Sequence, residues 1–171
     1  MRVLLSAEQI QSSIERLAAE IRDREAGRPL TVIAVMTGSI IFLADLIRKL
    51  DMPMRVGVIQ ARSYEGTERG ALSVNADMLP DVAGRDVLVV DDIFDTGQTL
   101  LEVLTFLDEL SPRSVRSAVL VLKQGKQRVG LRPNYVGFEI PDVFVVGYGL
   151  DYNDEFRHLP FLAELPTDFA S

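Results

Sequence analysis

The fold of this chain is decided by the stretch Val87-Leu88-Val89-Val90-Asp91-Asp92-Ile93-Phe94-Asp95-Thr96-Gly97-Gln98-Thr99. Its four leading branched apolar residues predict a parallel strand that is buried on both faces. Carboxylates then fall at the carboxyl end of that strand, where open α/β sheets bind their ligands. Apolar residues recur afterwards at helical spacing: Leu100, Val103, Leu104, Leu107 and Leu110. The residues from Thr96 to Thr99 are therefore expected at a helix N-terminus, where free N–H groups and the helix dipole favour a phosphate.

Two further helices are indicated by the spacing of apolar residues. Ser6 and Gln9 match a capping box, and an apolar stripe follows them: Ile10, Ile14, Leu17, Ala18 and Ile21. We expect this amphipathic helix to be the first element of the chain. Residues 32–36 then predict a short strand, Thr37-Gly38-Ser39 a turn, and residues 40–50 a second helix.

Further strands are predicted at residues 54–61, 115–122 and 143–148, and the polar residues 62–70 are expected to form a mobile loop. Strands that alternate with helices predict an α/β fold whose central, mainly parallel sheet is flanked by helices. No repeat or linker-like segment divides the chain, so we expect residues 1–171 to form a single domain.

Composition argues against several classes of function. The chain has 18 basic and 25 acidic side chains and a net charge of −7, which argues against a nucleic-acid surface or an anionic-membrane surface. Cysteine is absent, which excludes thiolate chemistry and, with no export signal, indicates a cytoplasmic location. The single histidine, His158, excludes multi-histidine metal sites. The longest apolar tract, residues 31–47, is interrupted and too short to span a membrane well.

Two motifs resemble those of known enzymes. The stretch from Asp91 to Thr99 resembles the phosphoribosyl-pyrophosphate motif of type I phosphoribosyltransferases, which orotate, adenine and uracil enzymes and some regulators share. Residues 135–142 and 144–152 are similar to the purine-binding hood of hypoxanthine-guanine phosphoribosyltransferases. The resemblance implies a type I phosphoribosyltransferase fold, with a core of about residues 1–130 and a small C-terminal hood formed mainly by about residues 131–165.

The resemblance also implies an activity. This is Mg²⁺-dependent transfer of ribose 5-phosphate from phosphoribosyl pyrophosphate to hypoxanthine, and also to guanine, which gives IMP or GMP and pyrophosphate in purine salvage. Asp91 and Asp92 would hold the ribose hydroxyls and favour Mg²⁺, Asp151 would be a further Mg²⁺ ligand, and Asp95 would exchange a proton with purine N7. The sugar phosphate would bind at the turn made of Thr96, Gly97, Gln98 and Thr99. Relatives imply a homodimer or homotetramer.

Other positions match residues that bind pyrophosphate, bind the purine or form a lid. The pyrophosphate group comprises Thr37, Gly38, Ser39 and Arg157. Many relatives carry lysine or arginine where this chain has Thr37, and loops of this kind often contain a non-proline cis peptide. The purine group comprises Lys123, which would donate to the 6-oxo group, together with Phe144 and Val145. Ser63 and Tyr64 match the lid that closes over the reacting centre.

Each of these assignments has a plainer alternative. Asp91 and Asp92 are also compatible with a solvated acidic turn, Asp95 with a helix N-cap, and residues 37–39 with an ordinary strand-to-helix turn. Lys123 is compatible with an exposed strand end and Phe144 with simple core packing. The remaining alternatives are a surface ion pair for Asp151 and Arg157 and an ordinary surface loop for Ser63 and Tyr64.

Two other functions remain open at this stage. A non-catalytic sensor of phosphoribosyl pyrophosphate would keep the sugar-phosphate loop, but the presence of the base-handling residues favours an enzyme. Residues 87–92 also resemble a Walker-B strand or the acidic pocket of a signalling receiver domain. The chain has no Gly-x4-Gly-Lys-Ser/Thr loop, and its acid pair lies halfway along the sequence rather than after the first strand.

Overall fold

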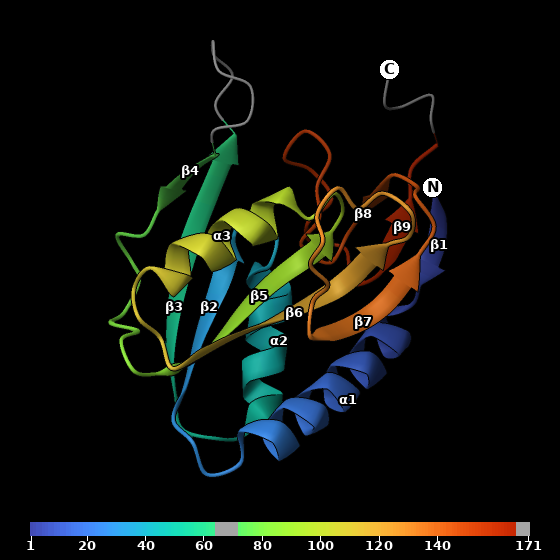
Figure 1. Ribbon diagram of the computed structural model, residues 1–171. Coiled ribbons are helices and arrows are strands. Elements are labelled where there is room, and N and C mark those ends of the chain that lie inside the picture. The colour runs from blue at the N-terminus through green and yellow to red at the C-terminus, as the bar shows by residue number, and fades with distance from the viewer. Residues whose placement is uncertain (64–71, 167–171) are drawn as a thin grey trace.

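The computed structural model describes residues 1–63 and 72–166. Figure 1 shows a twisted sheet with helices on both faces and a smaller group of strands near the chain ends. The elements in chain order are β1 Arg2–Leu5, α1 Ala7–Glu25, β2 Leu30–Met36, α2 Ile40–Leu50, β3 Met54–Ser63, β4 Leu72–Asn75, β5 Asp86–Phe94, α3 Gln98–Asp108, β6 Ser114–Lys123, β7 Tyr135–Ile140, β8 Val145–Val146 and β9 Leu162–Glu164.

The central sheet has six strands in the order β4-β3-β2-β5-β6-β7. All neighbours are parallel except β3 and β4, which pair antiparallel at one edge. This confirms the predicted α/β fold with a mainly parallel sheet. A second sheet, with the order β1-β9-β8, joins the two ends of the chain. Residues 131–165, expected to form the hood, contain β7 of the central sheet as well as β8 and β9.

Helices cover both faces of the central sheet because alternate strand residues point to opposite sides. On one side Val32 and Leu88 pack in the same core as α1 and α2, while on the other Ile33 and Val89 pack in the core of α3. This two-sided burial explains why β2 and β5 read as continuous apolar runs. Among the described residues no helix is long and apolar enough to cross a membrane.

The helix predictions agree closely with the structure. Ser6 caps α1 through the predicted capping box with Gln9, and every residue of the predicted apolar stripe is fully buried. Helix α2 has the predicted bounds, residues 40–50. The prediction that a helix comes first was wrong, because β1 precedes it. That strand is short and partly exposed, and its partner β9 lies at the far end of the sequence.

Several strand boundaries were also wrong. Strand β5 extends to Phe94, so Asp91 and Asp92 lie within the strand and not beyond its end. Strand β3 reaches Ser63 because it pairs with β4, so the loop predicted at residues 62–70 begins too early. The strand predicted at residues 143–148 is reduced to β8, because Gly147 and the residue after it have positive φ angles that turn the chain out of the sheet.

We expect Ile14→Ala to lower the free energy of unfolding by about 2–5 kcal/mol, because truncation of a fully buried side chain leaves a cavity. Ile14 is 0% exposed on the face of α1 that covers the sheet. The measurement is urea unfolding followed by circular dichroism. Leu101→Ala on α3 is the matched control, since Leu101 is 38% exposed. A loss in the control as large as that in Ile14→Ala would contradict the assignment of the core.

Candidate active site

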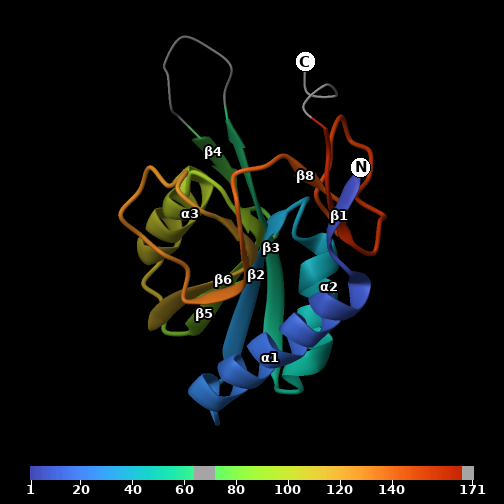
Figure 2. The ribbon, with the colours of Figure 1, turned by 90° about the vertical axis from the view of Figure 1, so that its right-hand side faces the viewer.

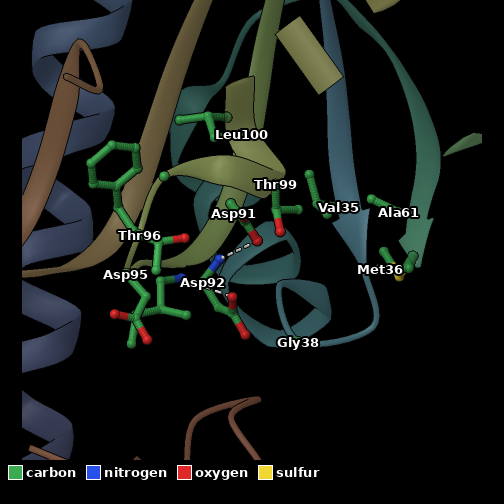
Figure 3. A pocket seen from close by; sticks show the side chains of 13 residues that line it. Val35, Met36, Gly38, Ala61, Asp91, Asp92, Asp95, Thr96, Thr99 and Leu100 are labelled. Carbon is green, nitrogen blue, oxygen red and sulfur yellow. Dashed lines mark hydrogen bonds between the residues drawn. The ribbon is translucent and has the colours of Figure 1, made fainter. Parts of the chain in front are cut away.

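A cavity of about 240 Å³ lies at the carboxyl ends of β2 and β5. It brings the predicted catalytic residue Asp95 together with residues predicted to bind the sugar phosphate or pyrophosphate: Gly38, Asp91, Asp92, Thr96, Gly97 and Thr99. Apolar residues complete the wall, among them Val35, Met36 and Leu100. Figure 3 shows Asp91, Asp92, Asp95 and Thr96 grouped around this space, with Gly38 beside Asp92.

The two adjacent acids on β5 are buried, with exposed fractions of 7% for Asp91 and 8% for Asp92. The N–H of Asp92 donates to Oδ1 of Asp91 at 3.0 Å, and the N–H of Ile93 donates to Oδ1 of Asp92 at 2.7 Å. In the described part of the chain neither carboxylate forms an ion pair. The alternative of a solvated acidic turn was therefore wrong.

Burial dominates the electrostatics of this pair. It raises the pKa of Asp91 well above its ordinary value, and the neighbouring charge of Asp92 raises it further. Burial also raises the pKa of Asp92, although hydrogen bonds to its carboxylate and the charge of Arg157 act in the opposite direction. Because burial disfavours their charged forms, the two carboxyl groups would be stabilised by a bound cation or a hydroxyl donor.

The predicted phosphate turn leads directly into α3. Gly97 stands at the N-cap with a φ of +86°, and a methyl group there would lie 2.4 Å from the Val129 side chain. Glycine is therefore required both for the backbone angle and for the space. The N–H of Gln98 donates to the Thr96 hydroxyl at 3.3 Å, whereas the Gln98 side chain donates to Glu102 and not into the cavity. The turn thus offers backbone N–H groups and the Thr99 side chain to an anion.

The predicted pyrophosphate loop approaches Asp92 closely. A methyl group on Gly38 would lie 1.8 Å from Oδ2 of Asp92, so only glycine leaves room for this carboxylate. The Met36–Thr37 peptide bond is cis, and Thr37 is exposed. Ser39 is fully buried, and its hydroxyl donates to the carbonyl of Val35. Ser39 therefore supports the loop with its side chain instead of offering its hydroxyl to a ligand.

The predicted catalytic acid Asp95 lies beside lysines. Nζ of Lys123 is 3.3 Å from Oδ2 of Asp95, and Nζ of Lys126 is 3.5 Å from Oδ1. Oδ1 of Asp142 lies 3.7 Å from Nζ of Lys123 and 3.3 Å from Nζ of Lys126. These four side chains form one cluster of two aspartates and two lysines. The N-cap alternative for Asp95 was wrong, because Gly97 occupies that position. The exposed-lysine alternative for Lys123 was also wrong, since Lys123 is only 6% exposed.

Lys126 and Asp142 are the site residues that sequence reasoning missed. Asp142 lies in the segment that resembles the purine-binding hood, and Lys126 lies only three residues after Lys123. The clue to their role is their position in the chain, because Lys126 follows β6 and Asp142 follows β7. These two strands are parallel neighbours in the sheet. Charged residues at the carboxyl ends of adjacent parallel strands are candidates for one cluster.

Beyond the cavity, the segment that follows β7 carries the other predicted purine residues. Phe144 is 40% exposed and meets Tyr152 edge to face, with the ring centroids 5.6 Å apart. Simple core packing of Phe144 was therefore wrong. Val145 is buried in β8, where it pairs with Glu164 of β9. The Phe144 ring is free to present a face to a flat ligand, and the neighbouring main chain is held by the second sheet.

Asp151 and Arg157 contact each other on the turns that follow β8. Nη2 of Arg157 is 2.8 Å from Oδ1 of Asp151, and Nη1 of Arg157 donates to the carbonyl of Gly149 at 2.7 Å. They therefore form the ion pair that was the plainer alternative. In the part of the chain that the structure describes, no three acidic or histidine side chains gather as a metal site, so Asp151 does not join Asp91 and Asp92 in one ligand set.

Only one of the two predicted lid residues lies in the described part of the chain. Ser63 is the last residue of β3, so its backbone continues the central sheet beside β4. Tyr64 lies outside the described residues.

Comparisons with known proteins agree with this fold and site. A family model described as a phosphoribosyl transferase domain matches residues 4–153. The chain is 39% identical to a hypoxanthine-guanine phosphoribosyltransferase of Mycobacterium avium, over 95% of this chain and 84% of that protein. It is 36% identical to a protein of the same name from Staphylococcus epidermidis, over 99% of this chain and 96% of that protein.

A solved structure is similar over the whole chain. The hypoxanthine phosphoribosyltransferase of Staphylococcus aureus superimposes with a TM-score of 0.94 at 32% identity, covering 100% of this chain and 94% of that one. The family model covers most of the chain, and the relatives exceed 30% identity along nearly its full length. The chain therefore belongs to the phosphoribosyl transferase family, and within it to the hypoxanthine-guanine phosphoribosyltransferases.

Proposed function

We propose that this site transfers ribose 5-phosphate from phosphoribosyl pyrophosphate to N9 of hypoxanthine or guanine, with release of pyrophosphate. The observation that carries the proposal is a single cavity that combines a buried carboxylate pair, a helix N-terminal turn and a loop with small residues. Asp95 and Lys123 lie together beside it. The names of the relatives supply the purine class.

The ribose and its phosphate would occupy the cavity. Asp91 and Asp92 would accept hydrogen bonds from the 2′- and 3′-hydroxyl groups, since ionised carboxylates are strong acceptors. The N–H groups at the start of α3, with the hydroxyls of Thr96 and Thr99, would bind the 5′-phosphate. Asp92 lies against Gly38, so the sugar and the pyrophosphate would meet at this contact.

The purine would lie between the Asp95–Lys123 pair and Phe144. Lys123 would donate to its 6-oxo group, Asp95 would hold or accept the proton on N7, and the Phe144 ring would stack on its face. Lys123 is paired with Asp95, so the two side chains that would contact the base already lie next to each other. The same pair argues against the sensor alternative, because a protein that only senses the sugar phosphate has no use for it.

Charge stabilisation would provide much of the catalysis. Bond cleavage at the ribose C1 develops positive charge on the sugar and negative charge on the departing pyrophosphate. The carboxylates of Asp91 and Asp92 lie on the sugar side, and Arg157 with the loop around Gly38 would hold the pyrophosphate. Fixed groups of this kind lower the barrier because they are oriented before the reaction begins.

Mg²⁺ is part of this proposal. Asp91 and Asp92 fit a divalent cation, because they are buried carboxylates with raised pKa values and no cationic partner in the described part of the chain. Mg²⁺ binds through one or two carboxylates together with substrate oxygens and water. Asp91 and Asp92 would hold one ion with the sugar, and Asp151 would be a ligand of a separate ion that binds with pyrophosphate. When bound, the ion supplies charge neutralisation for pyrophosphate.

Other parts of the proposal rest on the resemblance to this family. They are the lid role of Ser63 and Tyr64, assembly into a homodimer or homotetramer, a cytoplasmic location and the division into a core and a hood within one domain. Analytical ultracentrifugation of the purified chain would decide the assembly.

Asp95→Asn tests the catalytic role directly. We expect purified protein with phosphoribosyl pyrophosphate and Mg²⁺ to turn over hypoxanthine or guanine, and the variant to lose about 10²–10⁴-fold in kcat because it cannot accept the N7 proton. Absorbance-monitored turnover measures this, with xanthine and adenine assayed in parallel.

Asp108→Asn at the exposed end of α3 is the matched control for that experiment and should leave kcat unchanged. Absence of turnover with all four bases, despite retained binding of phosphoribosyl pyrophosphate, would reject the enzyme in favour of the sensor.

Asp91→Asn tests the cost of the buried acid pair. Because the pKa of Asp91 is raised, the native state binds more protons than the unfolded state between the ordinary and the raised value. The free energy of unfolding therefore falls as pH rises through that window. Above the raised pKa this loss of stability reaches its full size and no longer changes with pH. We expect Asp91→Asn to be more stable than the parent protein at pH 7, with the difference shrinking toward acidic pH.

The gain should be measured by urea unfolding at several pH values, where a tenfold change in the acid dissociation constant corresponds to about 1.4 kcal/mol. The same variant should lose activity, because it offers the ribose and Mg²⁺ one carboxylate fewer. Lower stability at pH 7 in the variant than in the parent would show that burial does not dominate at this position.

A further inference from the structure

A hydrogen bond outside the cavity joins the hood to α2. The Tyr148 hydroxyl donates to Oδ2 of Asp45, and both side chains are largely buried. Asp45 also accepts from the side chain of Gln11 at 3.0 Å and pairs with Arg48. Although burial acts to raise it, these hydrogen bonds hold the pKa of Asp45 below its ordinary value, so the acceptor is charged. Neither Asp45 nor Tyr148 lines the cavity among its described residues.

Tyr148 stands in a strained part of the chain. Its φ is +50°, and it lies between Gly147 and Gly149, whose φ angles are +99° and +98°. A non-glycine residue in the left-handed region is uncommon and needs compensation from its surroundings. The buried ring and its hydrogen bond to Asp45 provide it, because they hold the side chain of this residue at a fixed place on α2.

The residue after Tyr148 touches the pyrophosphate loop. A methyl group on Gly149 would lie 2.1 Å from the carbonyl oxygen of Gly38, so the two backbones are in direct contact. The Gly149 carbonyl also accepts from Arg157, whose guanidinium pairs with Asp151. The position of Gly149 therefore sets the position of the loop on one side and of Arg157 on the other.

Together these contacts form a ring that begins and ends at the pyrophosphate loop. Asp45 belongs to the helix that starts directly after the loop, and Tyr148 returns from the hood to that helix. Figure 2 shows the chain that follows β8 beside the N-terminal end of α2, to which the loop leads. Backbone hydrogen bonds also support this segment, because the N–H of Tyr148 donates to the carbonyl of Leu159 at 2.8 Å and the N–H of Gly149 donates to the carbonyl of Arg157 at 3.0 Å. The purine side does not involve the Tyr148 hydroxyl, because it is held by the pairing of β8 with β9. Loss of the Tyr148 bond should therefore loosen the pyrophosphate side and leave the purine side in place.

We propose that Tyr148 and Asp45 are positioning residues for the pyrophosphate half of the substrate: their hydrogen bond holds Gly149 against Gly38 and keeps Arg157 oriented. This inference rests on the proposed function and adds residues that touch no substrate. A bond that served only overall stability would affect the two substrates alike.

The test is steady-state kinetics of Tyr148→Phe with each substrate varied in turn. The variant keeps the buried ring and loses one hydroxyl. We expect KM for phosphoribosyl pyrophosphate to rise about tenfold, the size expected for a hydrogen bond to a charged group, with KM for hypoxanthine unchanged. KM for pyrophosphate in the reverse reaction should rise in parallel. The midpoint temperature of thermal unfolding should fall by about 2–4 °C, since one hydrogen bond is lost in a domain of this size.

Matched variants separate positioning from stability. Ser114→Ala is the control, because it also removes a hydroxyl that donates to a carboxylate, Oδ1 of Asp86 at 2.7 Å, but at the opposite end of the sheet from the cavity, so both KM values should stay unchanged. Asp45→Ala removes the acceptor and should match Tyr148→Phe. Asp45→Asn still offers an oxygen to the hydroxyl and should restore most of the affinity for phosphoribosyl pyrophosphate.

Equal changes in both KM values, or no change in either, would overturn the proposal. It would also be overturned if Tyr148→Phe and Asp45→Ala were both unfolded at the assay temperature, because the bond would then serve the fold as a whole. If the parent protein turns over no purine, the proposed function fails. Calorimetric binding of phosphoribosyl pyrophosphate with Mg²⁺ to parent and Tyr148→Phe then still decides the positioning claim.

Discussion

The site depends on strand β5, which stays paired with β6 beyond the residue where its pairing with β2 ends. β5 pairs with β2 only from Asp86 to Val90, whereas its pairing with β6 continues to Phe94. The acids at positions 91 and 92 follow directly on the point where β2 departs. Pairing with β6 keeps this segment extended and buried, while the open edge admits the loop that follows β2. The cavity exists because these two ladders end at different residues.

That arrangement lowers the stability of the folded protein. Two adjacent carboxyl groups are buried with no ion-pair partner among the described residues, and burial raises the pKa of both. Buried acids of this kind persist at sites where a ligand completes their interactions, because a core optimised for stability alone would replace them. The glycine at position 38 supports the same conclusion, since a larger residue would displace the Asp92 carboxylate. The local sequence therefore favours ligand binding over stability.

The sequence predicted the elements that local patterns define. The apolar stripe of α1, the bounds of α2 and the strand–turn–helix around Thr96 follow from periodicity and capping, which act over a few residues. Missed features depend on contacts between distant segments. β1 forms only because β9 lies beside it, and Lys126 meets Asp142 only because β6 and β7 are neighbours. The resemblance assigned roles to residues, but the ion pairs around Asp95 needed the tertiary structure.

Thr37 shows why backbone placement matters here. The family resemblance implies a lysine or arginine at this position in many members, whereas Thr37 is exposed and brings no charge to the loop. Pyrophosphate would then depend on Arg157 and on N–H groups, whose strength as hydrogen-bond donors depends steeply on angle. A flexible lysine can follow a shifted anion, but a backbone amide cannot. The contacts that hold Gly149 against Gly38 should therefore contribute more to substrate affinity in this chain than in a relative with lysine at position 37.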